Sequence, residues 1–233
     1  MGDSGQKVRT DLGSAGPARH RPLAGRAVAA SLLIGLVVVR ELVVAVTAWR
    51  YYALVRDALA GTATEADALA LDSSFLTTVS SELAYLLVPG FAAGLAFIVW
   101  LWRARANAEA ISGREAHRRS RLWIVWSWST VLVNLWYPYQ LVSDVWRASS
   151  PGRSASDGPV KAWWACFVLL GFLTPIQRGM AEEWTSEAEV LSSAQVSTVL
   201  ALLSLAAGVL AIVLIRRITA WQDSAQELTG SVR

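Results

Sequence analysis

Two adjacent charged residues, Arg40 and Glu41, lie inside the otherwise apolar run Ala27–Ala48. A charge at the centre of a membrane-spanning helix costs about 2.5–3.5 kcal/mol on insertion scales, so such residues face a bundle interior and pair there. Neighbouring helical residues point about 100° apart, and we therefore expect each to find its partner on another helix. The pair could belong to a structural ion-pair network or line the path of an ion or a ligand.

Polar side chains further along the chain are the candidate partners. For Arg40 they are Asn134, Gln140 and Asp144, and for Glu41 they are Arg103, Arg105 and Arg147. We predict an intramembrane polar cluster that consists of Arg40, Glu41, Asn134, Gln140 and Asp144. The alternative is a shifted first helix that exposes both charges to water.

Arginine and aromatic residues gather in two further runs, W-L-W-R-A-R-A-N-A-E at Trp100–Glu109 and N-L-W-Y-P-Y-Q at Asn134–Gln140, which continues to Ser149. These residue types dominate recognition surfaces, so we predict an inner-face motif that meets a partner. The alternative is a helix end anchored at the membrane surface. The motif comprises Trp102, Arg103, Arg105, Asn107, Glu109, Trp136, Pro138, Tyr139, Trp146 and Arg147.

Signatures of catalysis and of cofactor binding are missing from the sequence. His20 lies in a polar tail and His117 in a basic loop, so we expect neither a catalytic dyad nor a multi-histidine metal site. Glu41 is the only acid clearly placed at membrane depth, and the single cysteine, Cys166, excludes an intrachain disulfide and a thiolate metal site. We therefore predict no catalytic residue, no metal, no cofactor and no enzymatic activity.

The elements that position these residues are five apolar stretches in a chain with 54% hydrophobic residues. A spanning helix needs about 20 apolar residues, so the sequence predicts an all-α integral membrane protein. The stretches are Ala27–Ala48, Leu83–Trp102, Leu122–Val142, Val160–Ile176 and Gln195–Ile215.

The distribution of Lys and Arg decides between two topologies. If all five stretches span and the N-terminus is cytoplasmic, 12 of these residues are inside and 8 outside; if the third stretch returns to the side it left, 17 are inside and 3 outside. Because positive charges concentrate on the cytoplasmic side, we favour four spanning helices plus a broken or re-entrant Trp-rich segment. Five spanning helices remain the alternative.

The third stretch has the composition that such a segment needs. Its tryptophans and tyrosines favour the headgroup level of the bilayer, and Pro138 removes a backbone donor. Irregular backbone at that depth requires protein or a water-filled cavity to satisfy its polar groups.

The chain divides into three parts: a disordered basic N-terminal tail (1–26), a helical membrane domain (27–216) and a short polar C-terminal tail (217–233). We expect the first helix to run to Gly61, and a further helix to begin near Ser73 or Ser74, to kink at Pro89-Gly90 and to end at Ser112-Gly113. Gly90 and Gly94 form a G-x-x-x-G pair that would let another backbone approach closely.

Several of these motifs occur together in one known group. The R-A-R-x-N-A-E, N-L-W-x-P-Y-Q and D-V-W-R-A-S runs and Trp163-Trp164, in this order, resemble the bacterial membrane family catalogued as domain of unknown function 4328, over approximately Leu83–Gln222. The resemblance implies a multi-pass bacterial membrane protein and no assigned activity. Where relatives often carry Gly and Pro, this chain has Ser127 and Val131, which would shift any break towards Pro138.

The function predicted from the sequence is a non-enzymatic interaction or sensing module in the cell membrane, with a cytoplasmic N-terminus. Its partners would be the lipid bilayer and a protein at the cytoplasmic face. The net charge of +3 is explained by membrane orientation and not by nucleic acid. A small transporter or channel-like subunit, with a polar path lined by the first and third segments, is the alternative; an enzyme acting on lipid at the inner interface is weaker. The sequence does not decide the oligomeric state.

Overall fold

The structure of the chain is a computed structural model that describes residues 22–67, 82–128, 131–153, 155–181 and 186–230. Within these ranges every regular element is a helix, as predicted. The predicted disordered tail lies outside them except for its last residues, and so do Ser73 and Ser74, where the second long helix was expected to begin.

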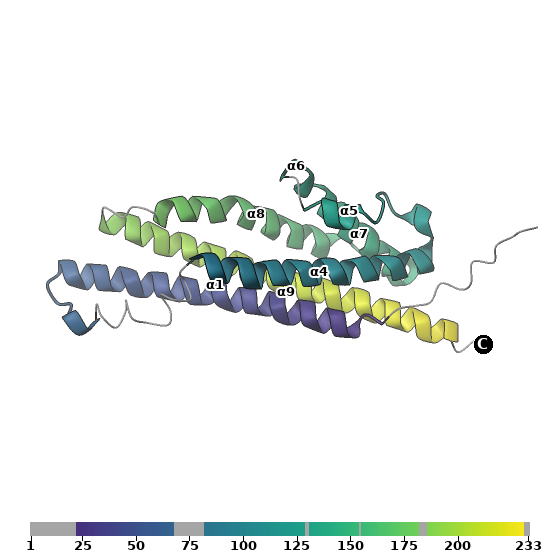
Figure 1. Cartoon of the computed structure of the whole chain (residues 1–233), viewed down its shortest axis with the longest axis horizontal. Helices are drawn as coiled ribbons and strands as arrows, with labels where there is room; N and C mark the ends of the chain where they lie inside the picture. Colours follow the sequence, from purple (N-terminus) through teal and green to yellow (C-terminus); the bar gives the residue numbers. More distant parts are fainter. Residues whose placement is uncertain (1–21, 68–81, 129–130, 154, 182–185, 231–233) are drawn as a thin grey trace, which may run out of the picture.

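Four long helices lie side by side in an elongated bundle (Figure 1): α1 (Ala24–Leu59), α4 (Glu82–Ser112), α8 (Gly158–Ala181) and α9 (Glu187–Gly230). Helix α1 packs on α9 and α4, and α8 packs on α9. The short elements gather near one end, which we call the α7 end. They are η1 (Arg114–Ala116), α5 (Trp123–Trp126), α6 (Val131–Asn134), α7 (Tyr137–Ser149) and η2 (Pro151–Arg153).

In the described part of the chain, three helical segments are long and apolar enough to cross a membrane: Ala24–Leu59, Gly158–Gln177 and Glu187–Glu227. This is fewer than the four predicted, because the stretch Leu83–Trp102 lies in α4, which is not among them. Only 17% of the apolar window in α1 and 11% of that in α8 is buried. Large apolar side chains therefore cover the outside of the bundle, an arrangement that suits lipid better than water.

The third apolar stretch is broken, as predicted. It forms α5, α6 and the beginning of α7 instead of one continuous helix. Pro138 stands in the first turn of α7, where a backbone N–H has no helical partner and the proline costs nothing. The segment also starts and finishes at the α7 end, since α4 leads into it there and α8 departs from there.

The helix ends partly agree with the predicted boundaries. Helix α1 is followed by Gly61 at φ +71°, and α4 ends before Gly113 at φ +79°, both as expected. The tail boundaries need correction. Helix α1 already begins at Ala24, and α9 continues to Gly230 instead of ending near residue 216. The extension of α9 is stabilised because Ile218 and other side chains beyond residue 216 pack into the core.

The hydrophobic core is concentrated at the α7 end. Trp100 of α4 and Trp146 of α7 are almost completely buried, and Trp146 makes an edge contact with Trp221 of α9 at 4.6 Å between ring centroids. Leu23, which directly precedes α1, is buried in the same cluster, so the beginning of α1 also packs at this end. This end therefore resembles the core of a water-soluble protein, whereas the remainder of the bundle exposes its apolar residues.

Helices α1 and α9 lie in close contact at Gly208. A β-carbon at this position would collide with Cγ2 of Val38. At Gly90 and Gly94, by contrast, nothing lies within 4 Å of an added β-carbon, so the predicted close approach does not occur there. Helix α4 also continues through Pro89 without interruption.

Replacing Gly208 by Leu should therefore lower the free energy of unfolding by about 1–3 kcal/mol through overpacking. Thermal unfolding of the purified protein in detergent measures the effect. Gly171→Leu is the matched control, because Gly171 is exposed on α8 with nothing within 4 Å of an added β-carbon. Combining Gly208→Leu with Val38→Ala should restore part of the loss; equal melting temperatures for Gly208→Leu and the control would contradict the packing.

Candidate functional site: a polar clamp and two pockets

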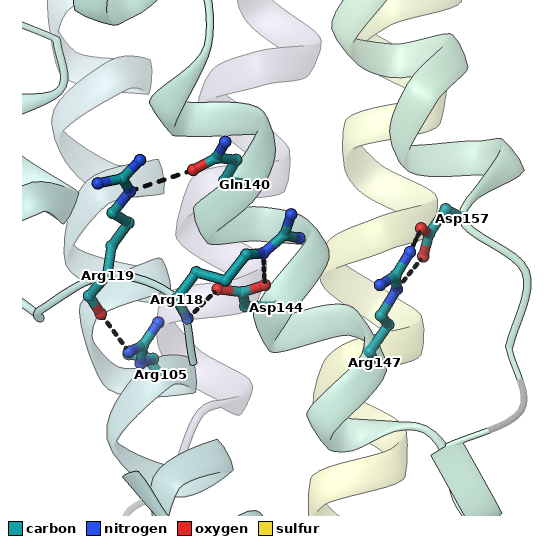
Figure 2. Close-up of polar contacts among 7 residues, drawn as sticks. All are labelled: Arg105, Arg118, Arg119, Gln140, Asp144, Arg147 and Asp157. Carbon is teal, nitrogen blue, oxygen red and sulfur yellow. Dashed lines mark hydrogen bonds and ion pairs between the residues drawn. The ribbon is translucent and has the colours of Figure 1, made fainter. Parts of the chain in front are cut away.

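Charged side chains from α4, the loop after η1 and α7 meet at the α7 end. On α4, Arg105 and Glu109 share a face because they are four residues apart, and Gln140 and Asp144 do so on α7. The loop that follows His117 lies between these two helices (Figure 2). We call the resulting cluster the polar clamp; it comprises Arg105, Glu109, Arg118, Arg119, Arg121, Gln140 and Asp144.

The deepest charge in the clamp is the guanidinium of Arg105, which is 1% exposed. Its Nε donates to Oε1 of Glu109 at 2.9 Å, and its Nη2 donates to the carbonyl oxygen of Arg119 at 2.6 Å. Arg121 donates to Oε2 of the same carboxylate. One carboxylate thus compensates two guanidinium groups. The three side chains together carry one excess positive charge, which lies near Arg121.

The ionisation of Glu109 depends on these arginines. Burial raises the pKa of the Glu109 carboxyl, but the hydrogen bonds from Arg121 and Arg105 lower it more, and the pKa lies below its usual value. The carboxylate therefore remains charged at neutral pH. A buried ion pair of this kind is stable only while both partners are present.

The loop is held to α7 by two further arginines (Figure 2). The backbone N–H and the Nε of Arg118 both donate to the Asp144 carboxylate at 2.8 Å, and Asp144 is 5% exposed. Arg119 donates from Nε to Oε1 of Gln140 at 3.2 Å and stacks over the Tyr137 ring, 4.2 Å from its centroid. The clamp therefore joins α4, the loop and α7 through side chains of both signs.

A separate ion pair connects α7 to the start of α8. Arg147 donates from two nitrogens to both carboxylate oxygens of Asp157, and one of these bonds measures 2.8 Å. The bonds from Arg147 lower the pKa of Asp157, and the same interaction raises the pKa of Arg147. Trp146 adds a hydrogen bond from its indole nitrogen to the carbonyl of Ser156 at 3.0 Å. Ser156 and Asp157, which precede α8, are thus both held to α7.

Helix α9 is tied to the same end by residues that the sequence did not single out. Gln222 is fully buried, and its Nε2 donates to the carbonyl of Ala104 at 2.9 Å and to Oγ of Ser149 at 2.7 Å. Trp100 donates to Oγ1 of Thr219 at 3.3 Å. A glutamine placed in the predicted C-terminal tail gave no signal of burial, and neither did Asp157, which precedes α8.

The predicted intramembrane cluster does not form. Arg40 pairs with its neighbour Glu41 on the same helix; the two side chains are 12% and 21% exposed. Gln140 and Asp144 bind arginines of the loop, and Arg105 and Arg147 bind other carboxylates. Asn134 lies in α6, and its buried Oδ1 has no hydrogen-bond partner in the described residues.

The residues of the predicted inner-face motif are distributed over different environments. Arg105, Glu109 and Arg147 make ion pairs, and Trp146, Asn107 and Pro138 are buried. Trp136 is 62% exposed, and Tyr139 is half-buried. Most of the motif therefore holds the helices together, while Trp102, Arg103 and Asn107 line a pocket.

Two pockets lie next to each other along α4. The first, the apolar cavity, has a volume of about 600 Å³ between α1, α4, α8 and α9. The second, the basic pocket, has about 660 Å³ and is lined by residues of α4, Arg26 and the segment after η1. Leu95 and Ile98 line both. The apolar cavity is lined by Ile34, Val37, Val38, Gly90, Phe91, Ala93, Gly94, Leu95, Phe97, Ile98, Trp128, Trp163, Phe167, Leu170, Ser204, Ala207, Gly208 and Ala211.

The described ranges contain no group of three or more His, Cys, Asp or Glu side chains that could hold a metal ion. His117 is buried beside the clamp, and its pKa is lowered by burial and then by the Arg105 charge, which outweigh the opposite effects of Asp144 and Glu109. The imidazole is therefore neutral at neutral pH.

The fold and the pockets describe an α-helical protein whose apolar helices can cross a bilayer and whose polar clamp lies at one end. The chain matches the family described as "Domain of unknown function (DUF4328)" over residues 60–220, which is more than half of its length, and it belongs to that family. The match extends further towards the N-terminus than the motifs recognised in the sequence. No curated protein matches the chain, and no solved structure does.

Replacing Glu109 by Gln should lower the free energy of unfolding by about 3–5 kcal/mol, because it leaves the buried Arg105 without its counter-charge. Asp57→Asn is the matched control. Asp57 pairs with Arg56 on the surface, with side chains 46% and 58% exposed, and its loss should cost less than about 1 kcal/mol. Denaturant titration in detergent distinguishes the two; equal losses would contradict a stabilising clamp.

His117 should make the stability depend on pH just below neutrality. Since its pKa is lowered in the folded protein, the unfolded chain binds the proton first, and the free energy of unfolding should fall as pH drops below about 6.5, by at most about 1.4 kcal/mol per pH unit. Glu109 and Asp157 have lowered pKa values and stay ionised in this range. Denaturant titrations between pH 7.5 and 5 should show a flatter dependence for His117→Gln; an unchanged slope would be inconsistent with a buried neutral imidazole.

Proposed function

We propose that the protein is a non-enzymatic sensing or interaction module of the bacterial cell membrane, and that the apolar cavity is its binding site. The three apolar helices cross the membrane together with α4, as a multi-pass bundle. In this arrangement the α7 end lies on the cytoplasmic side, where positive charges concentrate: Arg26 lines a pocket together with Arg121 of the clamp, and Arg216-Arg217 lie between the core residues Ile215 and Ile218 of α9.

The observation that carries this proposal is the apolar cavity itself. Its volume of about 600 Å³ falls in the range of small-molecule sites, about 300–1,000 Å³. No charged side chain is among the described residues that line it, and Ser204 supplies its hydroxyl group. The aromatic rings of Phe97, Trp128 and Trp163 form part of the wall, and the ring of Phe97 contacts both indoles. The chemistry favours an apolar molecule or an alkyl chain.

This lining favours binding over the alternative of ion transport. A polar path would need charged or hydrogen-bonding groups along its length, as ions in a membrane do not cross apolar surfaces. Arg40 and Glu41 neutralise each other on α1, and neither is among the residues that line the cavity. An interaction function therefore explains the described residues better than conduction does.

Helix α4 provides the connection between the cavity and the cytoplasmic end. Its residues from Gly90 to Ile98 form one wall of the cavity, and its last turns carry Arg105 and Glu109 of the clamp. A shift of α4 on binding would therefore move both the cavity wall and the clamp. A protein partner at the cytoplasmic face would meet the side chains of Arg118 and Arg147, which are 48% and 54% exposed.

Filling the cavity should abolish binding without unfolding the protein. Gly94→Leu places a side chain into the cavity where nothing lies within 4 Å of the new β-carbon, and it removes a helix-destabilising glycine. We expect a diazirine-bearing alkyl probe, photoactivated in membranes, to label cavity residues of α4, α8 and α9 in the native protein. Labelling of these peptides should fall severalfold in Gly94→Leu.

Gly171→Leu serves as the matched control, since Gly171 is on α8 outside the cavity. It should retain native labelling, and both variants should unfold at or above the native temperature. Equal labelling of cavity peptides in both variants would show that the probe reports only contact with bulk lipid, and the proposed binding site would be wrong.

A further inference from the structure

The basic pocket has the chemistry of an anion site at the edge of an apolar surface. Three arginines from separate parts of the chain line it: Arg26 at the start of α1, Arg103 on α4 and Arg121 from the segment after η1. No acidic residue is among its described lining residues. The other wall is apolar and is formed by Leu95, Ile98, Val99, Ala106, Ala110 and Val125, with Trp102 beside Arg103.

The clamp beside this pocket leaves positive charge at Arg121. Glu109, which pairs with this lining residue, accepts hydrogen bonds from both Arg121 and Arg105. A single carboxylate thus faces two guanidinium groups. The hydrogen bond of Arg26 goes to the carbonyl of Pro22, at 3.2 Å, which leaves its charge intact.

The basic pocket and the apolar cavity follow each other along one helix. Leu95 and Ile98 border both, and Arg103 and Asn107 come one and two turns further on. The helical rise along α4 from Gly90, which lines the cavity, to Arg103 is about 20 Å. This length is comparable with one leaflet of a bilayer, whose hydrocarbon is about 15 Å thick. An apolar space thus leads into a cationic one over the length of a lipid.

We propose that the two pockets together bind one anionic phospholipid, with an acyl chain in the apolar cavity and the phosphate against Arg26, Arg103 and Arg121. The guanidinium fork matches the geometry of phosphate oxygens, and the indole of Trp102 stands at the depth of the headgroup. This assignment rests on the proposed function, since it names the class of molecule that the cavity receives.

A phospholipid fits better than a free anion. Inorganic phosphate would use only the arginines and would leave the adjoining apolar space unfilled. An uncharged lipid would fill that space and would make no use of the arginines that line the basic pocket. Only a molecule with an alkyl chain and an anionic group satisfies the two pockets at once. The positive end of the site also lies where the headgroups of the cytoplasmic leaflet would be.

The test uses the full-length protein, purified in a neutral detergent, and native mass spectrometry of bound lipid. Phosphatidylglycerol and phosphatidylcholine with identical acyl chains are compared, and inorganic phosphate is added as a competitor. We expect phosphatidylglycerol to bind about tenfold more tightly than phosphatidylcholine, as charge-assisted hydrogen bonds to the phosphate and the absence of a choline cation predict. Inorganic phosphate at millimolar concentration should not displace it.

The variant Arg26→Gln/Arg103→Gln should lose most of this preference and keep the weaker binding of phosphatidylcholine. The matched control is Arg216→Gln/Arg217→Gln, which removes the same charge from exposed positions of α9 outside the basic pocket. It should retain the native preference. Thermal unfolding verifies that all variants are folded.

The possible failures are distinguishable. Equal binding of both lipids that is lost in Gly94→Leu would overturn the phosphate site and leave the apolar cavity as the binding site. Displacement of the lipid by inorganic phosphate would assign the arginines to a free anion. Binding that is the same in the native protein and in Gly94→Leu would overturn the proposed function as well.

Discussion

The structure depends on the burial of one charge, the guanidinium of Arg105, at the end of a helix that is otherwise apolar. A buried arginine is tolerated only when its hydrogen bonds and its charge are compensated by the protein. Glu109 supplies the charge from one turn away, and the carbonyl of Arg119 supplies an acceptor from the returning loop. The chain after α4 therefore turns back beside this helix, where the backbone of the loop meets the buried side chain.

The broken third stretch follows from the same constraint. Once the loop has turned back beside α4, Arg118 and Arg119 present cations to α7, and Asp144 and Gln140 accept their hydrogen bonds. Helix α7 is buried on most of its surface at the end of the bundle and does not extend across it. Gln140 and Asp144 are thus satisfied by protein, as polar groups near a membrane require. Arg147 and Asp157 then direct the chain into α8.

The sequence predicted the long helices well, because apolar runs of this length and glycines such as Gly61 and Gly113 are strong local signals. It also predicted the break, from tryptophan content, charge distribution and Pro138. It did not predict how the charges pair. Arg40 was assigned a distant partner because adjacent helical positions diverge, whereas the flexibility of arginine lets it reach Glu41. Gln222 and Asp157 act through tertiary contacts that leave no pattern in the sequence around them. Pairings of this type depend on which segments meet, and periodicity describes only one segment at a time.

The location of the two pockets follows from the different packing at the α7 end and in the remainder of the bundle. At the α7 end, buried tryptophans and ion pairs pack between the helices. Further along α4, Ala93, Gly94 and Ala207 are too small to fill the space between four helices, and the apolar cavity results. Excess positive charge accumulates where the clamp ends, because two arginines share Glu109. The same arrangement that stabilises the fold therefore creates, on one helix, an apolar space next to a cationic one, and an anionic amphiphile is the kind of molecule that uses both.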